Sequence, residues 1–288
     1  MQAINLFTLS PFHLNKKRGN MTKIAILYIG TGRYTIFWDE FYRSCEKNLL
    51  PNCEKHYFFF TDSKEFENDE KITIVQQENL GWPLITALRY KILNKVKEQL
   101  KDYDYVFFFN GNMEIIHTVT EEELLPTEEE GYIVAPLHSG NKRFKSNYEF
   151  EYERNPKSVS YIPYGEGKYY FHAGLLGGRT QEFLEMLDVC EKMMDDDLKN
   201  NIIPKFHDES VFNKYVLSRQ YKLLSNDYIH PTHGKPFLTL HPNIKIIQRD
   251  KSKFKYGGHA YLRGETPYKI TLMSYIKEKI KEVFCMKK

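Results

Sequence analysis

Short apolar runs alternate with segments of helical spacing through the first half of the chain. The apolar runs are typical of strands that are buried on both faces, and they cover residues 23–29, 56–60, 72–75 and 104–109. The segments with helical spacing cover residues 34–50 and 82–100. Alternation of this kind predicts an α/β fold with a mostly parallel central sheet and flanking helices.

Glycines and polar residues follow two of these strands, at what would be the carboxyl edge of the sheet. Gly30-Thr-Gly32 follows the first strand, and Asn110-Gly-Asn112 follows the fourth. Ligands of open α/β sheets bind outside this edge. The first segment lacks the G-x-G-x-x-G dinucleotide pattern, because Thr35 stands in place of the third glycine, but its backbone could still cradle a nucleotide. An ordinary turn remains the alternative at Asn110.

Asn110 and Asn112 also bear on metal binding. Two carboxylates at such a strand tip would hold a divalent metal against a diphosphate. Amides are neutral and are poor ligands for a hard cation, although they donate hydrogen bonds to sugar hydroxyls and phosphate oxygens. We therefore expect no divalent metal and no other cofactor.

The second half of the chain contains further candidate residues. Residues 138–170 are polar and tyrosine-rich, and a loop of this length in a compact domain is usually functional or mobile. His172 lies among small residues that let a ligand approach the backbone, although a structural histidine is the alternative. His207-Asp-Glu-Ser210 opens a predicted helix. These residues either cap the helix or hold a carboxylate near an anomeric carbon, where an oxocarbenium-like transition state needs one.

Composition and charge exclude several classes of protein. The 41 basic and 38 acidic residues are well mixed and give a net charge of +3, which does not suit a nucleic-acid partner. The four cysteines include no C-x-x-C pair, so we expect free thiols in a reducing compartment and no zinc site. No run approaches the roughly 18 apolar residues of a membrane span.

The two ends of the chain are predicted to differ from its body. In residues 1–20 an apolar patch precedes the basic residues, which is the reverse of a signal peptide, so we expect a dispensable extension of a cytoplasmic protein. Residues 266–288 carry an apolar stripe of helical spacing with lysines between. This basic amphipathic helix would either lie peripherally on the inner face of an anionic membrane or pack against the domain at residues 21–265.

Five stretches together resemble glycosyltransferase family 6, which includes the blood-group A and B transferases and the α-1,3-galactosyltransferases. The matching stretches are Gly32-Arg-Tyr34, Trp82 through Arg89-Tyr-Lys91, Phe107-Phe-Phe-Asn-Gly-Asn112, Tyr169-Tyr-Phe-His-Ala-Gly-Leu-Leu-Gly-Gly178 and His207-Asp-Glu-Ser-x-x-Asn-Lys-Tyr215. Animal members carry Asp-Val-Asp and need manganese, whereas bacterial members resemble this chain in carrying Asn-x-Asn. The resemblance implies a bacterial, metal-independent, retaining enzyme with one GT-A catalytic domain, whose sheet has a Rossmann-like nucleotide-binding half.

The resemblance also implies a reaction and the roles of the site residues. The reaction is the α-1,3 transfer of N-acetylgalactosamine or galactose from its UDP-sugar to a galactoside, with a fucosylated galactoside favoured. Glu209 would be the nucleophile or the ion-pair stabiliser. The residues implied to bind the donor are Ile29, Gly30, Thr31 and Tyr34 around the uracil and ribose, Arg89 and Lys91 at the diphosphate, Asn110 and Asn112 at the ribose and sugar, and His172, Ala173, Gly174 and Asp208 at the donor sugar.

The remaining expected contacts belong to the acceptor and to a lid. Phe206 and His138 are expected to contact the acceptor, and Phe206 stands where animal members carry a stacking tryptophan. A basic stretch of the chain is expected to close over the diphosphate and to exclude water, through Arg249, Lys251 and Lys253.

Two signals for the donor sugar conflict. His172 resembles the galactose-using members of the family, whereas Gly174 resembles the members that use N-acetylgalactosamine. We favour N-acetylgalactosamine, because an acetamido group needs volume and glycine leaves the most room.

A protein of the same fold that binds a sugar or nucleotide sugar without catalysis is the alternative. It would keep the aromatic and amide contacts, but it would not need Glu209 beside a nucleotide pocket. A nucleotidyl-transferring enzyme is disfavoured, because it would need metal-binding carboxylates where Asn110 and Asn112 stand.

Overall fold

The structure is a computed structural model that describes residues 21–232 and 241–269 and, beyond these, residues 271, 273, 276, 277 and 280. The predicted extension, residues 1–20, lies outside the described residues, and so does most of the predicted helix at residues 266–288. Among the described residues, no helix combines the length and the apolar character that crossing a bilayer requires.

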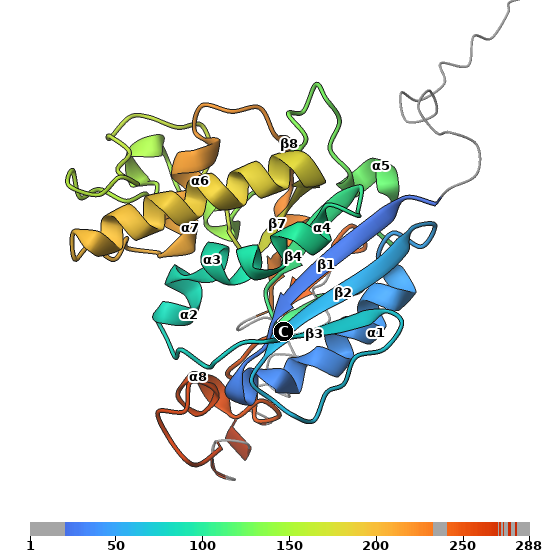
Figure 1. The fold of residues 1–288 in the computed structure, drawn as a ribbon. Helices are drawn as coiled ribbons and strands as arrows, with labels where there is room; N and C mark the ends of the chain where they lie inside the picture. The colour runs from blue at the N-terminus through green and yellow to red at the C-terminus, as the bar shows by residue number, and fades with distance from the viewer. Residues whose placement is uncertain are drawn as a thin grey trace, which may run out of the picture.

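A seven-stranded sheet forms the centre of the molecule, in the order β3-β2-β1-β4-β7-β6-β8 (Figure 1). In chain order its strands are β1 (Lys23–Ile29), β2 (Glu54–Thr61), β3 (Ile72–Gln76), β4 (Tyr105–Phe109), β6 (Ile133–Pro136), β7 (Leu175–Arg179) and β8 (Lys222–Leu224). All neighbours pair in parallel except β7, which runs antiparallel to β4 and β6. The predicted mostly parallel sheet is thus confirmed, although β6, β7 and β8 were not predicted as strands.

The central strands are apolar on both sides because helices cover both faces of the sheet. Residues of β1 from Ile24 to Tyr28 are fully buried. Alternate residues belong to two separate apolar clusters: Leu27 packs on one face and Tyr28 on the other. This burial explains why β1, β2 and β4 show continuous apolar runs and no alternation of polar and apolar residues.

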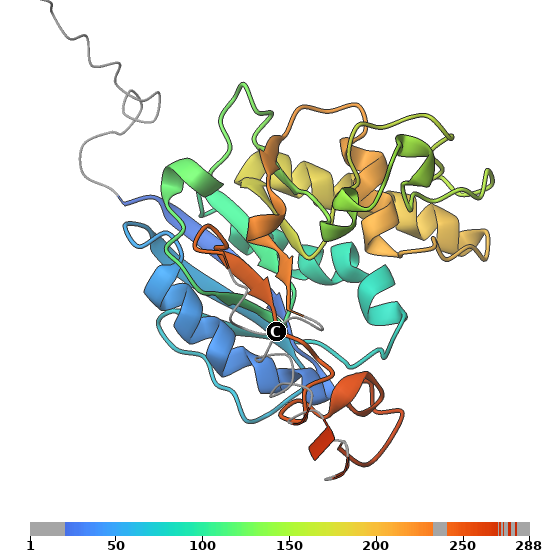
Figure 2. The same ribbon diagram turned by 180° about the vertical axis from the view of Figure 1, so that it is seen from behind.

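The helices divide between the two faces. Helix α1 (Trp38–Asn48) covers one face, where Figure 2 shows it beside the second, smaller sheet. The other face is covered by α3 (Arg89–Leu93), α6 (Thr180–Lys199) and α7 (Asp208–Val216). Two further helices, α5 (Glu121–Leu124) and α8 (Gly258–Leu262), are each about one turn long.

The single helix predicted at residues 82–100 is wrong in its continuity. The segment forms α2 (Leu84–Ala87), α3, a 3-10 turn at Asn94–Val96 and α4 (Lys97–Leu100). The first break lies at Leu88, which leaves helical geometry with φ −91° and ψ 14°. The predicted helix at residues 34–50 likewise begins as a 3-10 turn, at Gly32–Phe37.

A second sheet of three strands joins the tip of β4 to the later part of the chain. It has the order β5-β10-β9 and consists of β5 (Met113–Ile115), β9 (His230–Pro231) and β10 (Ile246–Gln248). Asn112 connects the two sheets, because its side-chain amide donates to the Arg249 carbonyl at 2.9 Å and its own carbonyl accepts from the Arg249 N–H at 2.7 Å.

The contact between β4 and β7 depends on a glycine. Phe107 is paired with Gly177, and a Cβ at Gly177 would lie 2.0 Å from Cδ1 of the Phe107 ring. We expect Gly177→Ala to lower the free energy of unfolding by about 1–3 kcal/mol, because the ring or the strands would have to move. Urea unfolding followed by circular dichroism measures the change.

Phe107→Ala provides the control for this prediction. Without the ring, the added methyl group of Gly177→Ala has space, so the double variant should lose less stability than the sum of the two single losses. Additive losses would contradict the contact.

Candidate active site

Several predicted site residues meet at the carboxyl edge of the central sheet. The N–H of Asn110, just after β4, donates to the Gly174 carbonyl, just before β7, at 2.7 Å. Arg89 lies on α3, while Asp208 and Glu209 form the first turn of α7. The sequence prediction that Asn110 follows a buried strand at this edge is therefore confirmed.

Arg89 is the centre of this cluster. Its guanidinium forms an ion pair with Asp208, donates to the Ala173 carbonyl at 2.9 Å, and donates to the Asn110 side-chain oxygen at 3.0 Å. Arg89 and Asp208 are only 6% and 5% exposed. Burial raises the pKa of the Asp208 carboxyl to about 7, while the Arg89 guanidinium acts in the opposite direction. Tyr90 completes the arrangement by donating to the Asp208 carbonyl at 2.8 Å.

Glu209 is held beside this ion pair by two donors. The Tyr170 hydroxyl donates to Oε1 at 2.6 Å, and the Ala173 N–H donates to Oε2 at 3.2 Å. The side chain is 15% exposed, and burial raises the pKa of its carboxyl although the hydrogen bonds oppose the shift. The carboxylate is therefore fixed in position, and it lies in the first turn of α7, where the helix dipole favours negative charge.

His207 supports this geometry from the preceding position. Its backbone has φ 51° and ψ −122°, which is unusual for a residue with a side chain. Its ring is held by a 3.1 Å hydrogen bond between Nδ1 and the Thr86 hydroxyl and by an edge contact with Trp82. The strained turn directs Asp208 and Glu209 into the cluster.

Two histidines next to Glu209 are neutral. The Nδ1 of His172 accepts from the Gly174 N–H at 2.7 Å, and the Nδ1 of His138 accepts from the Gly140 N–H at 2.9 Å. The rings stack with centroids 5.1 Å apart. Burial lowers the pKa of His172 to about 3 and that of His138 to about 4, and nearby positive charge adds to both shifts. Of the two rings, that of His138 acts to lower the pKa of the Glu209 carboxyl, against the larger effect of burial.

Gln248 holds the His172 ring from the second sheet. Its side-chain amide lies 2.9 Å from Nε2 of His172. Because Nδ1 of His172 is an acceptor, Nε2 carries the proton, and Gln248 must turn its oxygen toward it. Nothing in the local sequence pointed to Gln248.

His138, His172 and Glu209 are the described residues that come close enough to hold a metal ion, with ligand atoms within 4.8 Å of one another. Both histidine Nδ1 atoms already accept a backbone N–H. An ion bound at either of these atoms would have to displace that hydrogen bond. At the strand tip, the Arg89 guanidinium lies against Asn110 and would repel a cation there.

Cations gather at the other end of the cluster, near Tyr34. The Lys251 ammonium lies 5.2 Å from the centre of the Tyr34 ring, and Arg263 stacks on Trp82 with its guanidinium carbon 4.5 Å from the ring centre. Burial, with Arg89 and Arg263 as further causes, lowers the pKa of Lys251 to about 8. Lys251 has no carboxylate partner within the part of the chain that the structure describes. Arg263 was missed by the sequence analysis.

The residues predicted to bind the nucleotide lie at the end of β1 and in the turn that follows it. Gly32 donates its N–H to the Asp62 carboxylate at 2.7 Å, and the Thr31 hydroxyl lies 3.5 Å from the Asn79 side-chain oxygen. Tyr34 donates its N–H to the Thr31 carbonyl at 3.1 Å. Ile29 ends β1 and Gly30 follows it, so the four residues predicted at the nucleotide all lie between positions 29 and 34.

Three predicted residues have other partners. Lys91 points away from the cluster and pairs with Asp195 of α6 at 3.5 Å. Arg249 is buried, and its guanidinium pairs with Glu40 at 3.1 Å and Glu114 at 3.0 Å. The Asn112 side chain is occupied by the Arg249 carbonyl. Of the predicted lid residues Arg249 and Lys251, it is therefore Lys251 whose side chain lies near Arg89.

The backbone N–H groups of two further predicted residues, Lys253 and Phe206, form hydrogen bonds with residues nearby in the sequence. Lys253 donates its N–H to the Asp250 carbonyl at 3.1 Å. Phe206 precedes the strained His207 and donates its N–H to the Ser210 hydroxyl at 3.1 Å.

The physical reason given for the donor preference at Gly174 is wrong. A Cβ at Gly174 would lie 2.7 Å from the Asn110 side-chain nitrogen and 2.7 Å from Cε1 of His172. The space beside Gly174 is therefore filled by the protein's own side chains. It does not provide free volume for an acetamido group.

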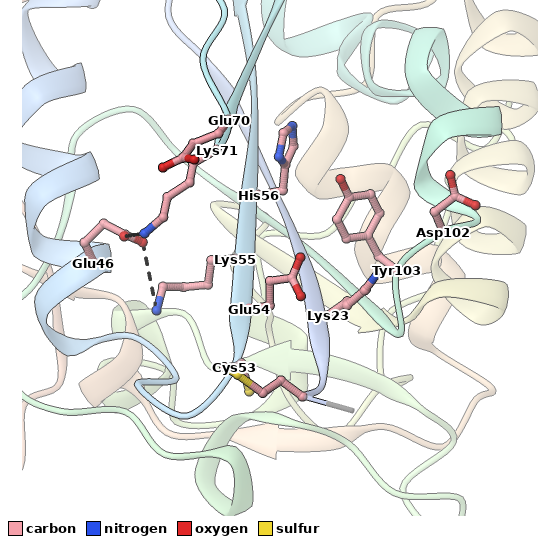
Figure 3. A pocket seen from close by; sticks show the side chains of 11 residues that line it. Lys23, Glu46, Cys53, Glu54, Lys55, His56, Glu70, Lys71, Asp102 and Tyr103 are labelled. Atoms are coloured by element: carbon pink, nitrogen blue, oxygen red, sulfur yellow. Dashed lines mark hydrogen bonds and ion pairs between the residues drawn. The ribbon is translucent and has the colours of Figure 1, made fainter. Parts of the chain in front are cut away.

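A cavity of about 640 Å³ lies at the opposite, amino edge of the sheet (Figure 3). Its walls carry both signs of charge, and Glu46 pairs there with Lys71 at 2.5 Å and with Lys55 at 3.9 Å. None of the predicted site residues lines it.

A mixed sheet of this order, with a carboxylate and a group of cations at its carboxyl edge, is the architecture of a GT-A glycosyltransferase. The model of glycosyltransferase family 6 matches residues 13–255. The chain belongs to this family, and the resemblance of its motifs is confirmed. The match begins inside residues 1–20, whose dispensability stays a prediction.

Similar proteins occur in bacteria and animals. O-antigen biosynthesis glycosyltransferase WbnI of Escherichia coli is 34% identical over 239 residues, which cover 82% of this chain and 98% of that protein. Globoside alpha-1,3-N-acetylgalactosaminyltransferase 1 of Gallus gallus is 27% identical over 73% of this chain, and histo-blood group ABO system transferase 1 of Rattus norvegicus is 28% identical over 72%. The chain spans 62% and 61% of these two animal relatives.

The lowered pKa of Lys251 predicts how a diphosphate should bind. UDP, as the probe, should bind roughly tenfold more weakly at pH 9 than at pH 7, because a lysine of pKa about 8 loses its charge over that range. Bound diphosphate would raise this pKa, so binding above pH 8 should take up a proton. Calorimetry in buffers of different ionisation enthalpy measures both effects.

Two variants control this measurement. Lys251→Met should bind UDP weakly at both pH values, with no proton uptake. Lys91→Met should behave as the wild type, because Lys91 lies on the other side of α3 against α6. Equal wild-type affinity at pH 7 and pH 9 would remove Lys251 from the diphosphate site.

Proposed function

We propose that this protein is a retaining, metal-independent α-1,3-glycosyltransferase that moves N-acetylgalactosamine or galactose from UDP to a galactoside acceptor. The observation that carries the proposal is the carboxylate of Glu209, which Tyr170 and Ala173 hold beside the buried pair of Arg89 and Asp208. The name of the Gallus gallus relative supports the α-1,3 linkage and N-acetylgalactosamine as the sugar.

Glu209 acts on the anomeric carbon. As the bond between this carbon and the diphosphate oxygen breaks, its electron pair leaves with UDP, and positive charge develops on the sugar ring. A fixed carboxylate stabilises that charge or forms a bond to the carbon. The acceptor hydroxyl then attacks from the face that UDP has left, which retains the configuration, and its proton passes to the departed UDP diphosphate.

The donor sugar lies between the ion pair and the histidines. Asp208 and Asn110 are both held by Arg89, so their oxygens have fixed positions for accepting from sugar hydroxyls. The neutral His172 ring forms the opposite wall. Because the room at Gly174 is already filled, the choice between galactose and N-acetylgalactosamine depends on the position of the His172 ring.

The leaving diphosphate is neutralised by protein cations. Lys251 and Arg263 gather near Tyr34, and Arg89 is within electrostatic reach of Lys251. Three positive side chains in a partly buried site interact strongly with a phosphate group. The segment from Arg249 to Arg263 closes over UDP as a lid.

The acceptor galactoside, favoured as a fucosylated one, contacts His138 and Phe206. His138 stacks on His172, so the acceptor and donor pockets share a wall. Peripheral membrane contact through residues 266–288 and a cytoplasmic location stay predictions.

Glu209→Gln tests the catalytic role. It should lower kcat by about a hundredfold or more, with the UDP affinity nearly unchanged, because a neutral amide of the same size no longer stabilises the developing cation. Transfer from UDP-galactose and UDP-N-acetylgalactosamine to a fucosylated galactoside is followed by mass spectrometry. Glu182→Gln on α6, where Glu182 pairs with Arg179, is the matched control.

If Glu209→Gln turned over as fast as the wild type, Glu209 would be neither the nucleophile nor the ion-pair stabiliser, and another residue would have to act in its place. Absence of transfer in the wild-type protein, with UDP-sugar binding intact, would favour the non-catalytic binding protein.

Activity should persist in EDTA. The strand tip offers two amides that are engaged with Arg89 and Arg249, and the diphosphate charge is met by side chains. The measurement compares initial rates after dialysis against EDTA and after addition of Mn²⁺, with an Asp-x-Asp family member as the positive control. A rate that EDTA abolishes and Mn²⁺ restores would overturn the metal-independent mechanism.

A further inference from the structure

Two large aromatic side chains stand exposed on the loop of residues 138–170. Tyr148 is 63% exposed and Tyr164 is 61% exposed. Their rings are nearly parallel, with planes at 14° and centroids 6.3 Å apart. At such exposed positions the tyrosine rings do not make the apolar contacts that buried aromatic rings make in a protein core.

The loop that carries this pair is held in place by internal hydrogen bonds. Arg154 donates to the Ile162 carbonyl at 2.5 Å and stacks on the Tyr164 ring with its guanidinium carbon 4.3 Å from the ring centre. The Asn147 side chain donates to the carbonyls of Gly165 and Gly167. The missing side chain at Gly165 leaves room for the Tyr148 ring, since a Cβ there would lie 3.2 Å from its hydroxyl.

Helix α6 anchors the same loop to the body of the protein. The buried carboxylate of Asp197 accepts from the Ser158 hydroxyl at 2.7 Å and from the Val159 N–H at 2.8 Å. The loop lies beside α6 and α7 in Figures 1 and 2. A surface so constrained loses little conformational entropy when it binds a ligand.

A row of contacts joins the exposed pair to Glu209. Tyr170, whose hydroxyl donates to Glu209, lies 5.7 Å from the Tyr152 ring. Arg154 stacks on Tyr152 at 5.2 Å and on Tyr164 at 4.3 Å. Tyr170 and Tyr152 are 1% and 2% exposed, so the inner part of the row belongs to the core. Only its outer end, Tyr148 and Tyr164, faces solvent.

We propose that Tyr148 and Tyr164 form an outer acceptor subsite that binds a sugar unit of an oligosaccharide, beyond the galactoside that receives the transferred sugar. The proposal rests on the proposed function, which supplies the glycan acceptor. Sugar rings present faces of C–H groups that pack on aromatic rings, and the tyrosine hydroxyls hydrogen-bond to the sugar hydroxyls.

The charge of the loop favours a neutral ligand. Residues 145–168 contain four basic and four acidic residues, which leaves no net charge. Such a surface does not attract an anionic membrane or a nucleic acid. An uncharged oligosaccharide that extends from the acceptor pocket fits both the chemistry and the position.

Acceptors of two lengths test the subsite. A disaccharide and a longer oligosaccharide with the same terminal galactoside are compared, and the wild type should show a lower KM for the longer one. Tyr148→Ala and Tyr164→Ala should raise the KM of the longer acceptor by about five- to tenfold. The KM of the disaccharide, the KM of the donor and kcat should stay unchanged.

Conservative and distant variants separate binding from folding. Tyr148→Phe and Tyr164→Phe keep the rings and should retain most of the preference for the longer acceptor. Tyr268→Ala, which removes another exposed tyrosine (77% exposed), should change nothing. An equal rise of KM for both acceptors in the alanine variants would make the pair structural, and an equal wild-type KM for both lengths would remove the subsite.

A binding measurement distinguishes failure of this proposal from failure of the proposed function. Calorimetric titration of the longer oligosaccharide into Glu209→Gln with UDP present needs no turnover. Weaker binding after Tyr148→Ala supports the subsite even if no transfer is found, whereas unchanged binding overturns it even if transfer occurs.

Discussion

The buried ion pair between Arg89 and Asp208 is the interaction on which the rest of the site depends. Moving two charges out of water costs several kcal/mol per ion, and their attraction offsets this only when the remaining polar atoms also have partners. Most of those partners come from separate elements: Arg89 also donates to Ala173 and Asn110, and Tyr90 donates to the Asp208 backbone, while Nε of Arg89 is buried without a partner among the described residues. One ion pair thus fixes α3 and α7 against the ends of β4 and β7.

The surrounding charges divide into those that hold the fold and those that are available to a ligand. Arg249 is neutralised by Glu40 and Glu114, and it attaches the second sheet to the first. Lys251, two residues later, lies near Arg89 and Arg263, and its pKa is lowered by burial and by like charge. With the neighbouring histidines neutral, the site presents cations to a leaving diphosphate and one carboxylate to the carbon where positive charge develops.

Much of this could be predicted from the sequence, and the errors have identifiable causes. The buried strands were predicted because continuous apolar runs leave few alternatives. The helix at residues 82–100 was predicted as continuous because its spacing is helical, but the break at Leu88 precedes Arg89 and Tyr90, which both contact Asp208. Gly174 suggested free space, yet distant residues fill that space with the Asn110 and His172 side chains.

The sequence by itself determined the family, the central strands and the set of polar residues at their tips. The strands and their tips follow from local patterns of apolar and polar residues, and the family follows from the order of its motifs. Only the tertiary structure decided which charges are paired. Lys91, Arg249 and Lys251 look alike in the sequence, but the first faces α6, the second meets Glu40 and Glu114, and the third lies close to other cations. The availability of a charge depends on burial and on partners up to about two hundred residues away, and no local pattern encodes either.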